Sequence, residues 1–72
     1  MNASKVKAMR YFLLESQVEF GKRVGVAAST ICAIENKHRD ISDYIRARLV
    51  KIEASLPQEE FNIFYDSFKK SA

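Results

Sequence analysis

Few residues of this 72-residue chain are of the types that do catalytic or metal chemistry. It has one cysteine, Cys32, and one histidine, His38. One Cys and one His do not complete the ligand set of an ordinary zinc site, so we expect no metal and no cofactor. No nucleophile and base, and no two carboxylates, recur at a spacing that would bring them together. We therefore expect that the protein is not an enzyme, and we interpret Cys32 as a small filler residue.

Binding chemistry is suggested instead by the segment GVAASTICAIEN, residues 25–36. If Ile31 and Ile34 turn inward on a helix of about 100° per residue, Ser29 and Ala33 point outward. Such small side chains let a helix backbone come close to its partner. Two cations, in the sequence Lys-His-Arg at 37–39, follow at once. A bare helix face beside cations favours binding of a polyanion. The alternative interpretation of the bare face is a close contact with another protein helix.

Composition limits the fold and its setting. The chain is long enough for one domain, residues 1–72, and 47% of it is apolar, enough for a packed core. A single cysteine excludes an internal disulfide and favours the cytoplasm, and no run approaches the roughly 20 apolar residues of a membrane span. Residues 1–52 carry ten Lys and Arg against five Asp and Glu, a net charge of +5, whereas residues 53–72 carry two against four. The basic part points to an anionic partner, and we expect neither a membrane nor a small-molecule ligand.

The hydrophobic periodicity predicts an all-α fold of five helices. The first begins at Asn2 or Ser4, ends near Glu15, and buries a stripe formed by Val6, Met9, Phe12 and Leu13. The second begins at Ser16, where Ser16 and Glu19 form a capping box, and it ends at Gly25.

The third helix covers about residues 27–36. The fourth begins at Asp40 or Ser42 and has Ile45, Leu49 and Ile52 on one face. The fifth begins with Pro57 near its first position and carries the aromatic stripe Phe61, Phe64, Tyr65 and Phe68.

The short connection between the second and third helices requires a tiny residue where they touch. Gly21, inside the second helix, meets that requirement, because a helical glycine costs about 1 kcal/mol relative to alanine and needs a reason. Over QVEFGKRVGVAASTICAIEN, residues 17–36, the chain resembles the helix-turn-helix regulators of the phage repressor, Cro and Xre type. The resemblance covers most of the chain and implies a compact, lambda-repressor-like domain with the second and third helices as its helix-turn-helix.

The resemblance also implies roles for individual residues. It places the third helix in the major groove of double-stranded DNA, with these residues facing the bases: Ala27, Ala28, Ser29, Cys32, Ala33 and Asn36. It assigns these residues to phosphates: Gln17, Thr30, Lys37, His38 and Arg39. It makes these residues structural: Arg10, Phe20, Gly21, Val24, Gly25, Val26, Ile31, Ile34 and Glu35. Arg10 and Glu35 are expected to pair.

Two departures from the family pattern matter. The centre of the presumed reading face has no Arg, Gln or Asn, so bidentate base recognition is largely missing. Lys37 stands where the family commonly has glycine, so Asn36 should take the left-handed cap of the third helix, or the helix should continue.

The function these features favour is a DNA-binding transcriptional regulator, a repressor of the Cro or Xre type from a phage or mobile element. It would act as a homodimer, with the aromatic stripe of the fifth helix as the candidate contact. The alternative is a protein-interaction module on the same fold, such as an antirepressor or antitoxin-like partner, with weak or lost DNA binding.

Overall fold

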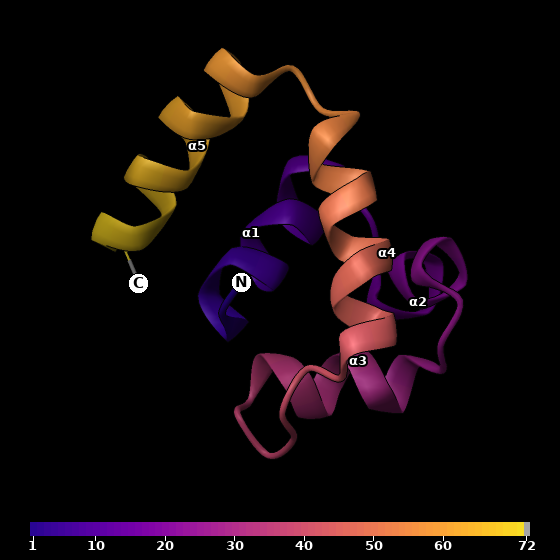
Figure 1. Ribbon diagram of the computed structural model, residues 1–72. Coiled ribbons are helices and arrows are strands. Elements are labelled where there is room, and N and C mark those ends of the chain that lie inside the picture. Colours follow the sequence, from indigo (N-terminus) through magenta and orange to yellow (C-terminus); the bar gives the residue numbers. More distant parts are fainter. Residues whose placement is uncertain (72) are drawn as a thin grey trace.

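Five helices and no strand make up the part of the chain that the structure describes (Figure 1). The computed structural model describes residues 1–71, with side chains for residues 1–70. The helices are α1 (Ala3–Phe12), α2 (Gln17–Val24), α3 (Ala28–Glu35), α4 (Asp43–Ala54) and α5 (Gln58–Ser71). The all-α class and the five helices are therefore confirmed.

Three of the helices begin at a side-chain cap predicted from the sequence. The Asn2 carboxamide accepts the backbone N–H of Lys5 at 2.8 Å, so Asn2 caps α1. The predicted capping box of α2 is confirmed by both of its bonds, between Ser16 and Glu19. Ser42 caps α4. Pro57 lies one residue before the first residue of α5, where its carbonyl accepts a helical N–H.

The helices α1 and α3 end in the same way, with a non-glycine residue in the left-handed conformation. Leu14 (φ 57°) follows α1 and Lys37 (φ 62°) follows α3. After each, the next N–H reaches back to a carbonyl five residues earlier, Glu15 to Arg10 at 3.1 Å and His38 to Ala33 at 2.8 Å. This is the Schellman pattern, in which glycine usually holds the left-handed position.

These ends correct two predictions. The first helix stops at Phe12 and not near Glu15, because the chain turns at Leu14. Asn36 does not take the left-handed cap of α3, since its φ is −92°, and the helix does not continue. Lys37 itself takes the strained conformation, and α3 covers Ala28–Glu35 in place of the predicted 27–36.

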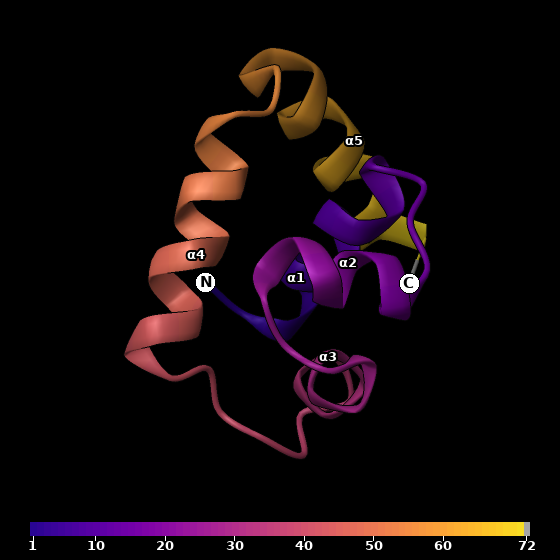
Figure 2. The same cartoon turned by 90° about the vertical axis from the view of Figure 1, so that its right-hand side faces the viewer.

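The core lies where α1, α2, α3 and α4 meet, and α5 closes one side of it. Its fully buried large side chains come from all five helices: Val6, Met9, Phe20, Val24, Ile31, Ile34, Leu49 and Phe61. Figure 2 shows α3 end-on below α1 and α2, with α4 running along one side. Val26, Ile52 and other half-buried apolar side chains pack against this cluster.

The aromatic stripe of α5 packs mainly on α1. The Phe12 ring meets Phe61 and Phe64 edge to face, each at 5.4 Å between centroids, and Tyr11 meets Phe68 in the same way. Phe61 has no exposed surface, so it is excluded from any dimer contact. Phe64, Tyr65 and Phe68 are half-buried, and the most exposed apolar residue of α5 is Ile63, at 67%.

Candidate nucleic-acid interface

The connection between α2 and α3 depends on two glycines. A Cβ at Gly21 would lie 2.7 Å from the carbonyl oxygen of Val26, so the backbone after α2 passes directly over this position. Gly25 has φ 92°, the left-handed conformation, and its N–H returns to the Gly21 carbonyl. The predicted close approach at Gly21 and the predicted stop at Gly25 are confirmed. Three residues, Gly25 to Ala27, separate the helices, an arrangement compatible with a helix-turn-helix.

An arginine of α4 holds this turn from the other side. The Arg48 guanidinium donates to the Val24 carbonyl at the end of α2 and lies 3.1 Å from where a Gly25 Cβ would be. It also lies over the Tyr44 ring, 5.7 Å from its centroid. No local sequence signal indicates this contact, because it joins residues 24 positions apart.

A second polar network joins one end of α1, α2 and α3. The Arg10 guanidinium makes a two-pronged bridge to Glu35, at 2.7 and 3.0 Å, and the Glu35 side chain is only 3% exposed. The predicted pair is thus present. Hydrogen bonding to Glu35 raises the pKa of Arg10 above its usual value, although burial opposes this. This bridge fixes α3 relative to α1.

Gln17 belongs to the same network. Its amide nitrogen donates to Glu35 at 3.3 Å, and the residue is half-buried at the start of α2. The Gln17 amide is therefore, with Arg10, a hydrogen-bond donor to the Glu35 carboxylate, a role the sequence did not suggest. Any phosphate contact of Gln17 would use its remaining atoms or the start of α2.

The outer face of α3 is nearly bare, as predicted. Ala27, Ser29 and Asn36 are exposed, while Cys32 and Ala33 between them are half-buried. The Asn36 amide donates to the Cys32 sulfur at 3.3 Å, so it is held along the helix surface. The other two assigned residues, Ala28 and Thr30, are half-buried. The face therefore projects little beyond the backbone.

The start of α3 lacks a side-chain cap. Ala27 occupies the capping position, and no side chain accepts an N–H of the first turn. The helices α2 and α4, by contrast, begin at Ser16 and Ser42, whose side chains each accept an N–H of the first turn. The Thr30 N–H reaches the Ala27 carbonyl at 3.0 Å, whereas the amides of Ala28 and Ser29 depend on solvent or a partner.

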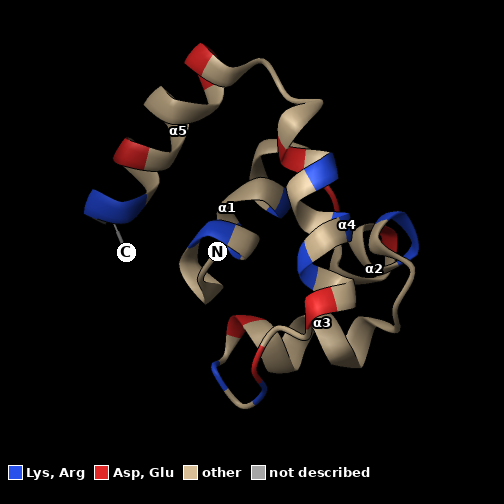
Figure 3. Cartoon of the chain, viewed as in Figure 1, with Lys and Arg blue, Asp and Glu red and all other residues tan. Residues whose placement is uncertain are grey.

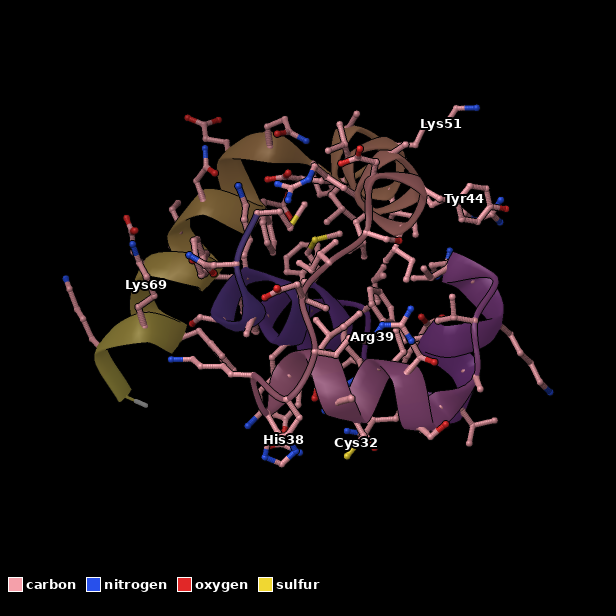
Figure 4. The ribbon with its side chains drawn as sticks, turned by 60° about the horizontal axis from the view of Figure 1, so that its bottom comes forward. Cys32, His38, Arg39, Tyr44, Lys51 and Lys69 are labelled. Carbon is pink, nitrogen blue, oxygen red and sulfur yellow. The ribbon has the colours of Figure 1, made fainter. Side chains whose placement is uncertain are left out.

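Cationic residues lie in the loop directly after α3 (Figure 3). Lys37, His38 and Arg39 are all exposed in the loop after α3. Figure 4 shows Cys32 and His38 projecting from one side of the α3 ribbon, with Arg39 on the other side of it. Within residues 1–70, no carboxylate lies within salt-bridge distance of Lys37 or Arg39. Arg23, by contrast, pairs with Glu15 at 2.6 Å, which raises the pKa of that arginine.

Across the described residues, no group of three or more His, Cys, Asp or Glu side chains is arranged to hold a metal ion. Nor does any described helix combine the length and apolar character needed to cross a membrane.

Comparisons with known proteins gave no match for this chain. No protein-family model, no curated protein and no solved structure matches it.

Proposed function

We propose that the protein binds double-stranded DNA through α3 and acts as a transcriptional regulator of the repressor type. The observation that carries this proposal is the bare outer face of α3, with unpaired Lys37 and Arg39 directly beyond its end. A helix whose outer side chains are this short can lie deep in the major groove, where the groove admits an α-helix. Cations at its end are then placed to meet the phosphates that border the groove.

The frame around α3 supports the same proposal. The Arg10–Glu35 bridge and the close passage at Gly21 hold α3 rigidly against α1 and α2. A rigidly held helix reads a groove better than a mobile one, because less conformational freedom is lost on binding. With few polar side chains on the face, discrimination between sequences would depend on Ser29, on Asn36 and on DNA shape.

A homodimer is part of the proposal. The molecule measures 28 × 24 × 21 Å, less than the roughly 34–36 Å that separate two half-sites on DNA. One copy therefore covers one half-site, and two copies are needed for the affinity of a typical repressor. Because Phe61 is buried, the contact would use the outer side of α5, including Ile63.

A salt titration tests the phosphate contacts. Reversing Lys37 and Arg39 to Glu together should weaken binding to a pool of random 20-base-pair duplexes and reduce the slope of log K against log salt by about 2. The matched control reverses Lys51 and Lys70, which are exposed on α4 and α5 away from α3. An equal loss in both double variants would mean that net charge alone attracts DNA, which would contradict the assignment.

The alternative, a protein-interaction module, has one observation in its favour. Leu14 is 91% exposed and Val18 54%, at the connection between α1 and α2. If the protein binds a partner protein there, Leu14→Ser should abolish capture of that partner and leave DNA affinity unchanged. Loss of function only on changing the α3 face would reject the surface at Leu14 and Val18 as the partner-binding site.

A further inference from the structure

A cationic cleft lies between the start of α1, the loop after α3 and the start of α4. Its volume is about 560 Å³, within the range of roughly 300–1,000 Å³ that small-molecule sites occupy. The half-buried side chains of Met1 and Ile41 contribute apolar surface, while Lys37, Arg39 and Arg46 bring three positive charges to its wall. Asp40 is the one acidic residue of the lining.

The charges of this cleft are not balanced within the protein. None of its three cations, and not Asp40 either, takes part in a salt bridge among residues 1–70. Arg23 on α2, by contrast, has its carboxylate partner Glu15 at 2.6 Å. Three like charges around one cleft repel each other, and an anion between them would relieve that repulsion.

The backbone at Lys37 adds a separate observation. Its φ of 62° is the left-handed conformation, which glycine adopts far more easily than lysine. A strained residue of this kind persists only where the surrounding structure holds it, and strained positions often mark binding sites. Here the strained residue is one that directs a cation to the cleft wall.

We propose that this cleft binds a small organic anion, in which a phosphate or carboxylate is joined to an apolar body. The anionic group would contact Lys37, Arg39 and Arg46, since arginine and lysine are the usual partners of such groups. The apolar body would lie against Met1 and Ile41. This departs from the sequence-based expectation that no small molecule binds.

A regulatory consequence rests on the proposed function. Lys37 and Arg39 belong both to the cleft and to the proposed phosphate contacts, so an anion in the cleft and DNA would compete for the same two cations. Each ligand would then weaken binding of the other by the same factor.

Phenyl phosphate is a suitable probe, because it joins a dianion to a small apolar ring. In ¹H–¹⁵N correlation spectra without DNA, it should cause saturable shifts at residues 34–41, at Arg46 and at the first turn of α1, at concentrations up to about 10 mM. Phenol, which lacks the charge, and inorganic phosphate, which lacks the ring, should each bind more weakly. Arg46→Gln should weaken phenyl phosphate binding about fivefold, whereas Lys22→Gln, an exposed change on α2, should not.

The spectra also verify that each variant is folded. No saturable shift, shifts centred elsewhere, or the same affinity in both variants would overturn the cleft proposal. Arg46 is outside the assigned DNA contacts, so binding of phenyl phosphate to a protein that does not bind DNA would support the cleft while rejecting the proposed function. DNA binding unaffected by saturating phenyl phosphate would reject the competition.

Discussion

Lys37 combines a strained backbone with a cation that has no salt-bridge partner among residues 1–70. Lysine in the left-handed conformation is strained, and α3 ends there without glycine. The side chain nevertheless remains unpaired beside the α3 face and in the cleft wall. The structure thus combines an unfavourable backbone conformation with a well-placed cation, as expected where binding matters more than stability.

Replacing this lysine tests the strain. Lys37→Gly should raise the free energy of unfolding by roughly 0.5–1 kcal/mol, because glycine adopts φ 62° without a Cβ clash. The control is Asn36→Gly, at φ −92°, where glycine brings only extra freedom to the unfolded chain and should lower stability. Urea unfolding measures both variants. Equal effects of the two substitutions would show that the backbone at Lys37 is not strained.

Glu19, in the capping box of α2, makes a pH-dependent contribution to the stability of the fold. The Glu19 carboxylate accepts the backbone N–H of Ser16, and this bond is the main reason why the pKa of Glu19 lies below its usual value of 4.5. Hydrogen bonding with the Ser16 side chain lowers the pKa further. A carboxyl with a lowered folded-state pKa stabilises the fold above its unfolded-state value, and this stabilisation is lost as the pH falls through the folded-state pKa. Glu19→Gln keeps a capping side chain without the charge. The wild type should therefore melt at a higher temperature than the variant above about pH 5, and the two should converge at lower pH. A difference that is constant from neutral to acidic pH would contradict this origin.

At the scale of elements, α3 is the least self-sufficient helix. It is eight residues long, has no side-chain cap and carries no acidic residue in its first turn. Its place in the fold depends on Ile31 and Ile34 in the core and on the Arg10–Glu35 bridge. Removing one partner would leave the other charge buried and uncompensated, which typically costs about 3–5 kcal/mol, so both residues are needed to keep α3 in place.

A cap at Ala27 should stabilise α3. Ala27 has extended backbone angles suited to a capping residue, and Ala27→Ser would supply an acceptor for the first-turn amides. We expect the free energy of unfolding to rise by about 1 kcal/mol, measured by chemical denaturation. Ser4→Ala, a loss of hydroxyl inside α1 where Asn2 is already the cap, serves as the control and should change stability little. No gain from Ala27→Ser would indicate that the α3 amides are already satisfied.

The crossing of α2 and α3 gives an element-scale prediction in which two effects oppose each other. Alanine is better than glycine in a helix by about 1 kcal/mol, but a Cβ at Gly21 would lie 2.7 Å from the Val26 carbonyl. Overpacking usually costs about 1–3 kcal/mol, and backbone is less able to yield than a side chain, so Gly21→Ala should be destabilising overall. Lys22→Ala, exposed on the same helix, is the control. A more stable Gly21→Ala protein would refute the close approach.

At the scale of the whole molecule, much of the fold could be predicted from local signals. The caps at Asn2, Ser16 and Ser42 and the stop at Gly25 depend on residues a few positions apart, and the structure has all four. The apolar periodicity likewise identified the core of each helix. These features are local, and local chemistry can be read from a sequence.

The misses came from contacts that no short window contains. The Arg48 contact that holds the carboxyl end of α2 spans 24 positions, and the hydrogen bond from Gln17 to Glu35 spans 18. The ends of α1 and α3 are local features, yet they were predicted wrongly. Glycine is the usual signal for the left-handed position, and neither Leu14 nor Lys37 is glycine. The residues of the α3 face are exposed or half-buried, and the loop cations Lys37 and Arg39 are exposed. What they bind stays a prediction.

The charge distribution is also a property of the whole molecule. Residues 1–52 carry a net charge of +5, whereas residues 53–72 carry −2. Figure 3 shows acidic residues along α5, on the far side of α1 from α4. The asymmetry would orient the molecule with α5 away from DNA, so that association depends strongly on salt.

The most direct test of the central claim is the DNA affinity of Ser29→Glu, which places an anion on the exposed α3 face. Ser29 is in the first turn of α3, where a carboxylate favours the helix, so the variant should be as stable as the wild type or slightly more so. Asn62→Glu, exposed on α5, makes the same change of charge at a distance. Against duplexes selected from a random pool by the wild type, Ser29→Glu should lose about 2 kcal/mol or more of binding free energy, roughly thirtyfold, while Asn62→Glu should stay within about threefold. A folded Ser29→Glu protein that binds these duplexes as tightly as Asn62→Glu would contradict the account, because α3 would then not be the helix in the groove.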